Sequence, residues 1–144
     1  MRHRNSRHRL GIKPAHERMF KRNLVTSLLL YEQVRTTKRR AQVVAPMVDR
    51  LITTAKSAAP HNAIRAINRV VTDKNASRKI MEVYVKRFAS VSSGLTRMVP
   101  VGARVGDGAS LVDLMLVEGT PVTVEPKPAK KAAEPKKPRS SVKK

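Results

Sequence analysis

The strongest constraint on folding lies in the first residues of the chain. Positions 2–9 carry four Arg, two His and no apolar side chain. Such a segment buries too little apolar surface to offset the entropy lost on ordering, so it must take its structure from a partner. Residues 1–22 hold eight Lys or Arg against the single acid Glu17. Because guanidinium groups match phosphate oxygens in planar, paired geometry, the arm predicts a nucleic-acid partner.

Positive charge continues along the rest of the chain. The net charge of +21 arises from 31 basic and 10 acidic residues, with +7 in residues 1–22, +8 in 23–120 and +6 in 121–144. A folded protein this basic repels itself, so we expect its compact state to depend on counter-charge from a bound polyanion.

Length and composition predict one folded body between two basic ends. The 144 residues suit a single domain. We expect an RNA-binding arm at 1–13, an α/β body at 14–119 and a Pro/Ala/Lys-rich tail at 120–144. Five of the nine prolines lie in residues 121–144, which lack periodic apolar positions. We therefore expect the tail to be disordered when free.

Several classes of protein are excluded by composition. The chain has no Cys, which excludes disulfides, thiolate metal sites and cysteine nucleophiles. The longest apolar run, at 28–31, is far too short to span a membrane. The Arg-rich start lacks the Ser-rich, amphipathic pattern of a transit peptide, so we expect it to belong to the mature protein.

Hydrophobic spacing predicts the element order helix, strand, three helices, two strands. The first helix should begin at about Pro14 or Ala15, since Pro is tolerated at a helix start. A short strand should follow at 32–37, where β-branched residues replace the helical pattern. The residues expected on the inner face of the first helix are Phe20, Leu24, Leu28 and Tyr31.

The clearest helical pattern starts at Lys38. Pro46 should kink this helix, but the periodicity continues past it. Basic residues occupy the outer half, and for them a solvated face and an RNA contact are both open interpretations. The expected inner positions are Val43, Val44, Met47, Val48, Leu51, Ile52 and Ala55, and the outer basic ones are Lys38, Arg39, Arg50 and Lys56.

Two further helices and a hairpin should complete the body. A helix over 61–71 follows Pro60, and another begins near Thr72 or Asp73, either of which can cap it. Strands at 96–102 and 111–117 should pair across a Gly-rich turn, with Pro100 at a sheet edge or a bulge. The expected inner residues of the two helices are Ile64, Ile67, Val70 and Val71, then Ile80, Met81, Tyr84, Val85 and Phe88.

The residue types needed for catalysis are present without their partners. His3 and His8 lie between arginines with no nearby acid to orient them, and His16 and His61 lie at expected helix starts. We expect all four to bind phosphate or solvent. Spacing reveals no acid pair for hydrolysis or metal-ion catalysis. The sequence therefore predicts no enzyme, metal or cofactor.

The aromatic residues favour core positions over base stacking. All four, Phe20, Tyr31, Tyr84 and Phe88, fall on apolar helical stripes, so binding should rest on phosphate and sugar contacts and on shape. Arg97 and Arg104 flank the expected hairpin, and a rigid β-turn can present a guanidinium to a groove of nucleic acid. The predicted RNA-binding set is Arg2, His3, Arg4, Arg7, His8, Arg9, Lys13, Arg18, Lys21, Arg22, Arg39, Arg97 and Arg104.

Several short motifs, taken together in order, carry a family resemblance. They are Met1-Arg-His-Arg, Met19-Phe20, Asn23 ahead of Ser27-Leu28, Thr36-Thr37, Pro46-Met47-Val48, Leu51-Ile52-Thr53, Arg87-Phe88-Ala89-Ser90, Thr96-Arg97 and Arg104-Val105-Gly106-Asp107. With them, residues 1 to about 118 strongly resemble the bacterial ribosomal large-subunit protein seventeen family. Ser93-Gly94-Leu95 stands where that family often has Gly-Gly-Tyr, and the tail extends beyond its shorter members.

The resemblance implies a two-layer α/β (α+β) fold, which agrees with the elements expected above, and a structural protein of the cytoplasmic ribosome. Its partners would be large-subunit ribosomal RNA near the exit of the peptide tunnel and neighbouring ribosomal proteins, with no small-molecule substrate and no membrane. Two other classes stay open from the residues alone. A DNA-architectural protein would also fit basic arms and a Lys-Pro-Ala tail, and an RNA-processing enzyme would need His3 or His8.

Overall fold

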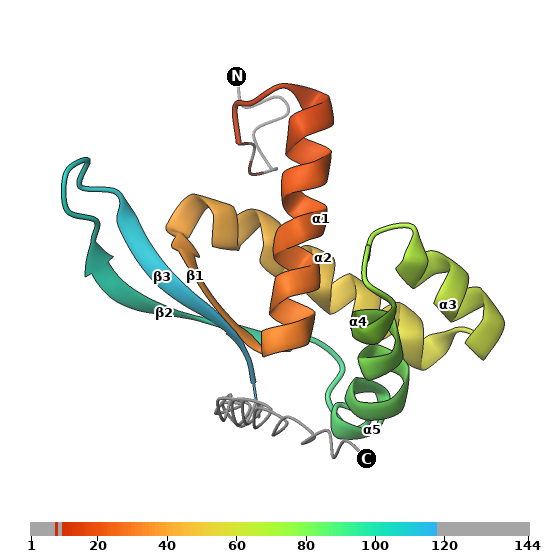
Figure 1. Ribbon diagram of the computed structural model, residues 1–144. Coiled ribbons are helices and arrows are strands. Elements are labelled where there is room, and N and C mark those ends of the chain that lie inside the picture. Colours follow the sequence, from red (N-terminus) through yellow and green to blue (C-terminus); the bar gives the residue numbers. More distant parts are fainter. Residues whose placement is uncertain (1–7, 9, 118–144) are drawn as a thin grey trace, which may run out of the picture.

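The computed structural model describes residue 8 and residues 10–117 (Figure 1). Most of the predicted arm, including Arg2, His3, Arg4, Arg7 and Arg9, and the whole of the predicted tail lie outside the described residues.

The described chain is a mixed α/β fold with the predicted order of elements. The elements are α1 (Pro14–Tyr31), β1 (Gln33–Thr37), α2 (Lys38–Ser57), α3 (Pro60–Asn68), α4 (Lys74–Lys79), η1 (Ile80–Tyr84), α5 (Val85–Arg87), β2 (Thr96–Ala103) and β3 (Ser110–Leu116). The short pieces α4, η1 and α5 follow one another without a break and form the predicted fourth helix, with a π-helical turn inside it. The Asp73 carboxylate caps this segment by accepting a hydrogen bond from the Asn75 backbone N–H, at 2.6 Å.

The three strands form one antiparallel sheet in the order β1-β3-β2. Since β2 is an edge strand, Pro100 removes no hydrogen bond from a central strand. The register also shifts between Pro100 and Gly102, which confirms the predicted bulge. The β2–β3 hairpin extends away from the helices and places its turn far from the core (Figure 1).

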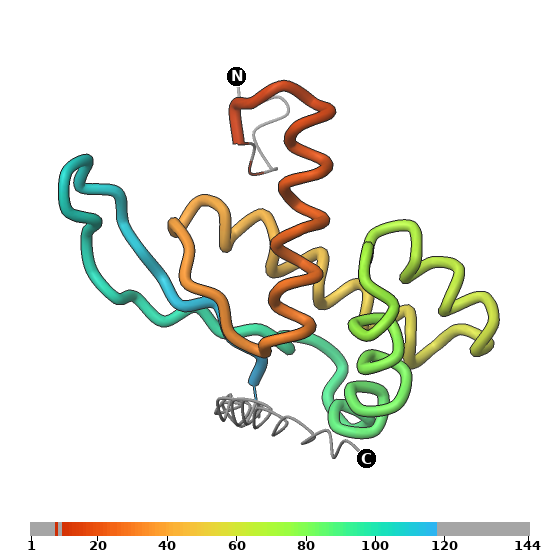
Figure 2. The backbone as a smooth tube through the Cα atoms, viewed as in Figure 1, coloured from red at the N-terminus to blue at the C-terminus, as the bar shows by residue number. Residues whose placement is uncertain are grey.

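The core lies between α2 and the sheet. The α2 residues Val44, Val48 and Ile52 are buried, and α2 contacts all three strands. Figure 2 shows the chain turning back after α1, through β1 into α2, so that α1 crosses α2. Pro46 is exposed and α2 continues past it, as predicted. The facing sheet residues are Val112, Leu114 and Leu116, and the core is completed by Val25, Leu28, Leu29, Tyr84, Phe88 and Leu95.

Two predicted inner residues are exposed. Tyr31 is 60% exposed, because the buried stripe of α1 runs through Val25, Leu28 and Leu29 and leaves Tyr31 at its margin. The prediction that all four aromatic residues belong to the core is therefore wrong for Tyr31. Ile64 is 42% exposed, since the short helix α3 buries only the stripe through Ala63 and Ile67, and Ile64 lies beside that stripe.

Phe20, a third predicted inner residue, is half-buried. The guanidinium of Arg40 lies over its ring, 4.7 Å from the centroid. Phe20 thus marks the boundary between the core and the basic surface.

Glu32 joins the end of α1 to the α4–α5 segment. It has a left-handed backbone (φ 63°), and its carboxylate is buried between Lys79 and Arg87, at 2.7 Å from each. Burial alone would raise the pKa of this carboxyl, but hydrogen bonds from Arg87 and Lys79 outweigh burial and hold the pKa below its ordinary value. Beside it, the Tyr84 hydroxyl donates to the Leu29 carbonyl at 2.6 Å.

We predict that Glu32→Gln destabilises the protein by about 1–3 kcal/mol at pH 7, because two half-buried cations lose their counter-charge. The folded-state pKa of Glu32 is lowered, so its contribution is complete above its ordinary pKa of 4.5 and is lost as the pH falls below that value. Urea unfolding from pH 7 to pH 3 should show that the difference in free energy of unfolding between wild type and variant shrinks below pH 4.5.

Glu82→Gln is the control, since Glu82 is exposed and lies 4.0 Å from Arg78. A difference that stayed constant to pH 3 would contradict this assignment.

Candidate nucleic-acid interface

The first turns of α1 carry four of the predicted binding residues. Lys13 and Arg18 are exposed, and Lys21 forms an ion pair with Glu17. Arg22 is half-buried, and its Nε donates to the Val70 carbonyl at 3.0 Å. The hydrogen bond ties α1 to the connection between α3 and α4, so the α1 cations belong to the folded body and not to a free arm.

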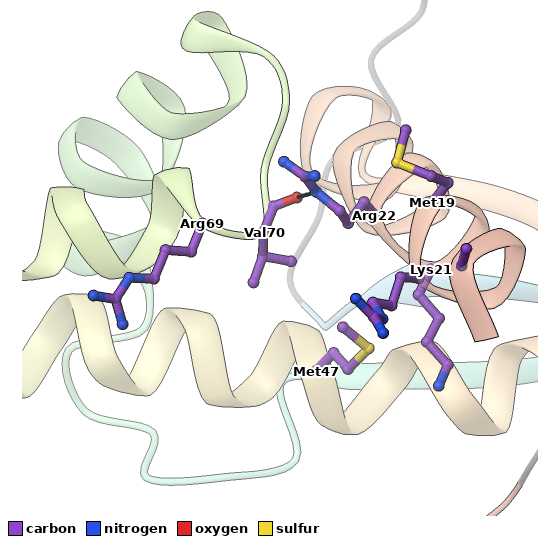
Figure 3. Close-up of a pocket in the computed structure, with 8 residues that line it drawn as sticks. Met19, Lys21, Arg22, Met47, Arg69 and Val70 are labelled. Atoms are coloured by element: carbon purple, nitrogen blue, oxygen red, sulfur yellow. Dashed lines mark hydrogen bonds between the residues drawn. The ribbon is translucent and has the colours of Figure 1, made fainter.

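A groove lies where α1, α2 and the α3–α4 connection meet. Its volume is about 470 Å³, and Figure 3 shows Met47 on α2 below it, Met19 and Arg22 on one side, and Arg69 and Val70 on the other. Arg69 was not among the predicted residues, since it is distant from α1 in sequence. The groove is lined by Ala15, Arg18, Met19, Lys21, Arg22, Met47, Arg69 and Val70.

The start of α2 forms a second basic site. Lys38, Arg39 and Arg40 occupy its first turn, which holds no acidic residue, and the Thr37 side chain makes no capping bond. Cations are unfavourable at the positive end of a helix dipole. The arm reaches this point, since Arg39 Nη1 donates to His8 Nδ1 at 2.9 Å. The structure thus brings together two predicted residues that are distant in sequence.

The third basic site is the sheet face formed by alternate residues of the three strands. Arg97 on β2 is exposed and shares a register row with Met115 and Gln33. In the next row of this face, the Arg35 Nε–H donates to Asp113 Oδ1 at 2.8 Å. Hydrogen bonding from Arg35 holds the pKa of Asp113 below its ordinary value. Arg35, which the sequence analysis missed, thus lies on the same face as Arg97.

The hairpin turn holds Arg104, another predicted binding residue, in an ion pair with Asp107. Its Nε donates to Asp107 Oδ1 at 2.9 Å, and this hydrogen bond lowers the pKa of Asp107 to about 2. The Arg104 guanidinium is therefore engaged within the turn. Val105, beside it, is fully exposed.

Residue 8 and residues 10–117 contain no cluster of three His, Cys, Asp or Glu that could hold a metal ion. No helix in this part of the chain is long and apolar enough to cross a membrane.

Comparison with known proteins decides the family. The family model for ribosomal protein L17 matches residues 20–117, which include every described strand and most of every described helix. The chain belongs to the ribosomal protein L17 family. This confirms the predicted family and, with it, the prediction of a non-enzymatic protein.

Relatives in the L17 family come from several organisms. A large ribosomal subunit protein bL17 from Desulfosudis oleivorans is 39% identical over 93% of this chain, which spans 65% of that relative's length. The bL17 protein of Syntrophotalea carbinolica is 39% identical over 82% of this chain and 76% of its own length. That of Endomicrobium trichonymphae is 38% identical over 76% of this chain and 92% of its own length.

The first turn of α2 allows a test of whether its cations are placed for binding at the expense of stability. We predict that Lys38→Glu raises the free energy of unfolding of the isolated protein by about 0.3–1 kcal/mol at low ionic strength, because an acid suits the positive end of the helix dipole. The same variant should bind large-subunit RNA more weakly. Thermal unfolding and filter binding measure the two effects.

Arg50→Glu is the matched control, since it makes the same charge change at an exposed position in the middle of α2. It should lack the gain in stability. Equal stabilisation by both variants would show that relief of general charge repulsion, and not the helix dipole, is responsible.

Proposed function

We propose that this protein is a structural constituent of the large ribosomal subunit that binds and braces large-subunit ribosomal RNA and so supports translation. Membership of the L17 family supports this proposal, as do the relatives, which are named large ribosomal subunit proteins. We further propose a location near the exit of the peptide tunnel in the cytoplasmic ribosome, beside neighbouring ribosomal proteins. No small-molecule substrate or catalytic step is part of the proposal.

The observation that carries the proposal is the first turn of α2. Lys38, Arg39 and Arg40 are consecutive cations at the positive end of a helix of 20 residues. This arrangement costs stability in the isolated protein and becomes favourable when phosphates lie against it. Arg39 also holds His8, so the arm would approach the same phosphates.

The folded body and the arm would have different tasks. The body holds three basic sites on a rigid framework: the cations of α1, the first turn of α2 and the sheet face that carries Arg97. Such a framework suits recognition of RNA shape. The arm residues Arg2, Arg4, Arg7 and Arg9, with His3, would thread between RNA helices and contact their phosphates. Affinity would come from phosphate contacts and selectivity from shape.

Salt dependence tests the electrostatic part of this proposal. If about six phosphates are neutralised, affinity for large-subunit RNA should fall on the order of a thousandfold between 50 and 200 mM salt. Filter binding at several salt concentrations measures the slope. A parallel competition with duplex DNA should leave most protein on the RNA, whereas preference for the DNA would favour an architectural role on DNA. Affinity independent of salt would refute the phosphate contacts.

The arm can be tested separately in cells. Deletion of residues 2–13 should leave the body folded, because the described core begins within α1. The truncated protein should enter large subunits poorly, which sedimentation of ribosomal subunits and quantitative mass spectrometry can measure. Circular dichroism of the purified truncation serves as the folding control. Normal incorporation would show that the arm is dispensable.

A further inference from the structure

The groove between α1, α2 and the α3–α4 connection has an apolar floor and a cationic rim. Met47, below the groove, is half-buried, and Met19, on one side of it, is 49% exposed, so both thioether side chains are accessible from the groove. Arg18, Arg22 and Arg69 line it from two sides, and none of its lining residues is acidic within the described chain. Lys21, also in the lining, is paired with Glu17. The groove therefore combines apolar contact area with a net positive charge.

Arg22 is the best-positioned cation of the rim. Its hydrogen bond to the Val70 carbonyl fixes the guanidinium at the side of the groove, as the dashed line in Figure 3 shows. A guanidinium held by one N–H still has a flat face and further donors for a ligand. Less side-chain entropy is lost on binding, because the orientation is already fixed.

The volume and chemistry of the groove favour a nucleotide. Its 470 Å³ lies within the range of about 300–1,000 Å³ typical of small-molecule sites. A regular RNA helix presents phosphates and sugars outward, and its bases could not reach the methionines. A nucleotide turned out of its stack presents an apolar base face together with its phosphates. Polarizable methionine sulfur makes favourable contacts with aromatic rings, so Met19 and Met47 can replace the aromatic platform of other RNA-binding proteins.

We propose that this groove binds one unstacked nucleotide of ribosomal RNA, with its base against Met19 and Met47 and its phosphates against Arg18, Arg22 and Arg69. This inference rests on the proposed function and adds a base-contacting site to it. A protein partner fits less well, because three arginines that have no carboxylate partner within the described residues surround a small apolar floor, which matches the high charge density of a polynucleotide.

Photo-crosslinking in assembled subunits tests the proposal directly. The full-length protein would carry p-benzoylphenylalanine in place of Met19, at the exposed edge of the groove, and would be purified within large ribosomal subunits. Irradiation and mass spectrometry should then yield a crosslink to an unpaired nucleotide of large-subunit RNA. The matched control places the same probe at Ile64, an exposed apolar residue of α3 that lies outside the groove lining, and should not label that nucleotide.

The outcomes separate this inference from the proposed function. Absence of the protein from large subunits would overturn the proposed function itself. A protein that enters subunits but crosslinks at residue 19 to another protein, to a base-paired nucleotide, or to nothing would overturn the groove proposal alone.

Binding in solution gives a second measurement. The probes are a short oligoadenylate and the same strand with an abasic nucleotide at its centre. Wild type should prefer the intact strand by about fivefold, as expected from burial of roughly 40 Å² of apolar surface. Met47→Ala should remove most of this preference while keeping the phosphate contacts, and Ile64→Ala should retain it. Equal binding of both strands by the wild type would overturn the proposal.

Discussion

The buried carboxylate of Glu32 is the interaction on which the rest of the structure depends. The Glu32 backbone N–H donates to the Leu28 carbonyl at 2.8 Å and ends α1, and its carbonyl accepts from the Leu116 N–H of β3 at 3.0 Å. Its side chain holds Lys79 and Arg87. One residue therefore joins the first helix, the sheet and the α4–α5 segment, and these elements position the basic sites.

Four other described acids also serve the fold. Asp73 caps α4, Asp113 pairs with Arg35, and Asp107 closes the hairpin turn. The Asp49 carboxyl faces the backbone N–H groups of Gly94 and Leu95, where burial raises its pKa. These four acids interact with groups inside the structure. The cations of the first turn of α2, those of α1 and Arg97 therefore contribute positive charge at the surface. The arrangement reconciles a stable body with a large positive charge available to RNA.

The elements were predictable because their signals are local. Pro14 at a helix start, the periodicity of α2 through Pro46 and the glycines of the hairpin turn each depend on neighbouring residues, and all were placed within a few positions of the observed bounds. The placement of Pro100 at a sheet edge or a bulge was predictable because proline has no backbone N–H to donate to a neighbouring strand. The errors at Tyr31 and Ile64 arose because spacing identifies a stripe on a helix but not how far the packing of other elements extends over it.

The sequence by itself determined the charge of this protein, the order of its helices and strands, its lack of catalytic partners and its family. The tertiary structure alone decided which cations lie together. It placed Arg69 across a groove from Arg22, joined His8 to Arg39, engaged Arg104 within its own turn and left Tyr31 exposed. Charge and helical period are properties of the local sequence, whereas a groove is formed by side chains from distant segments that only packing brings into contact.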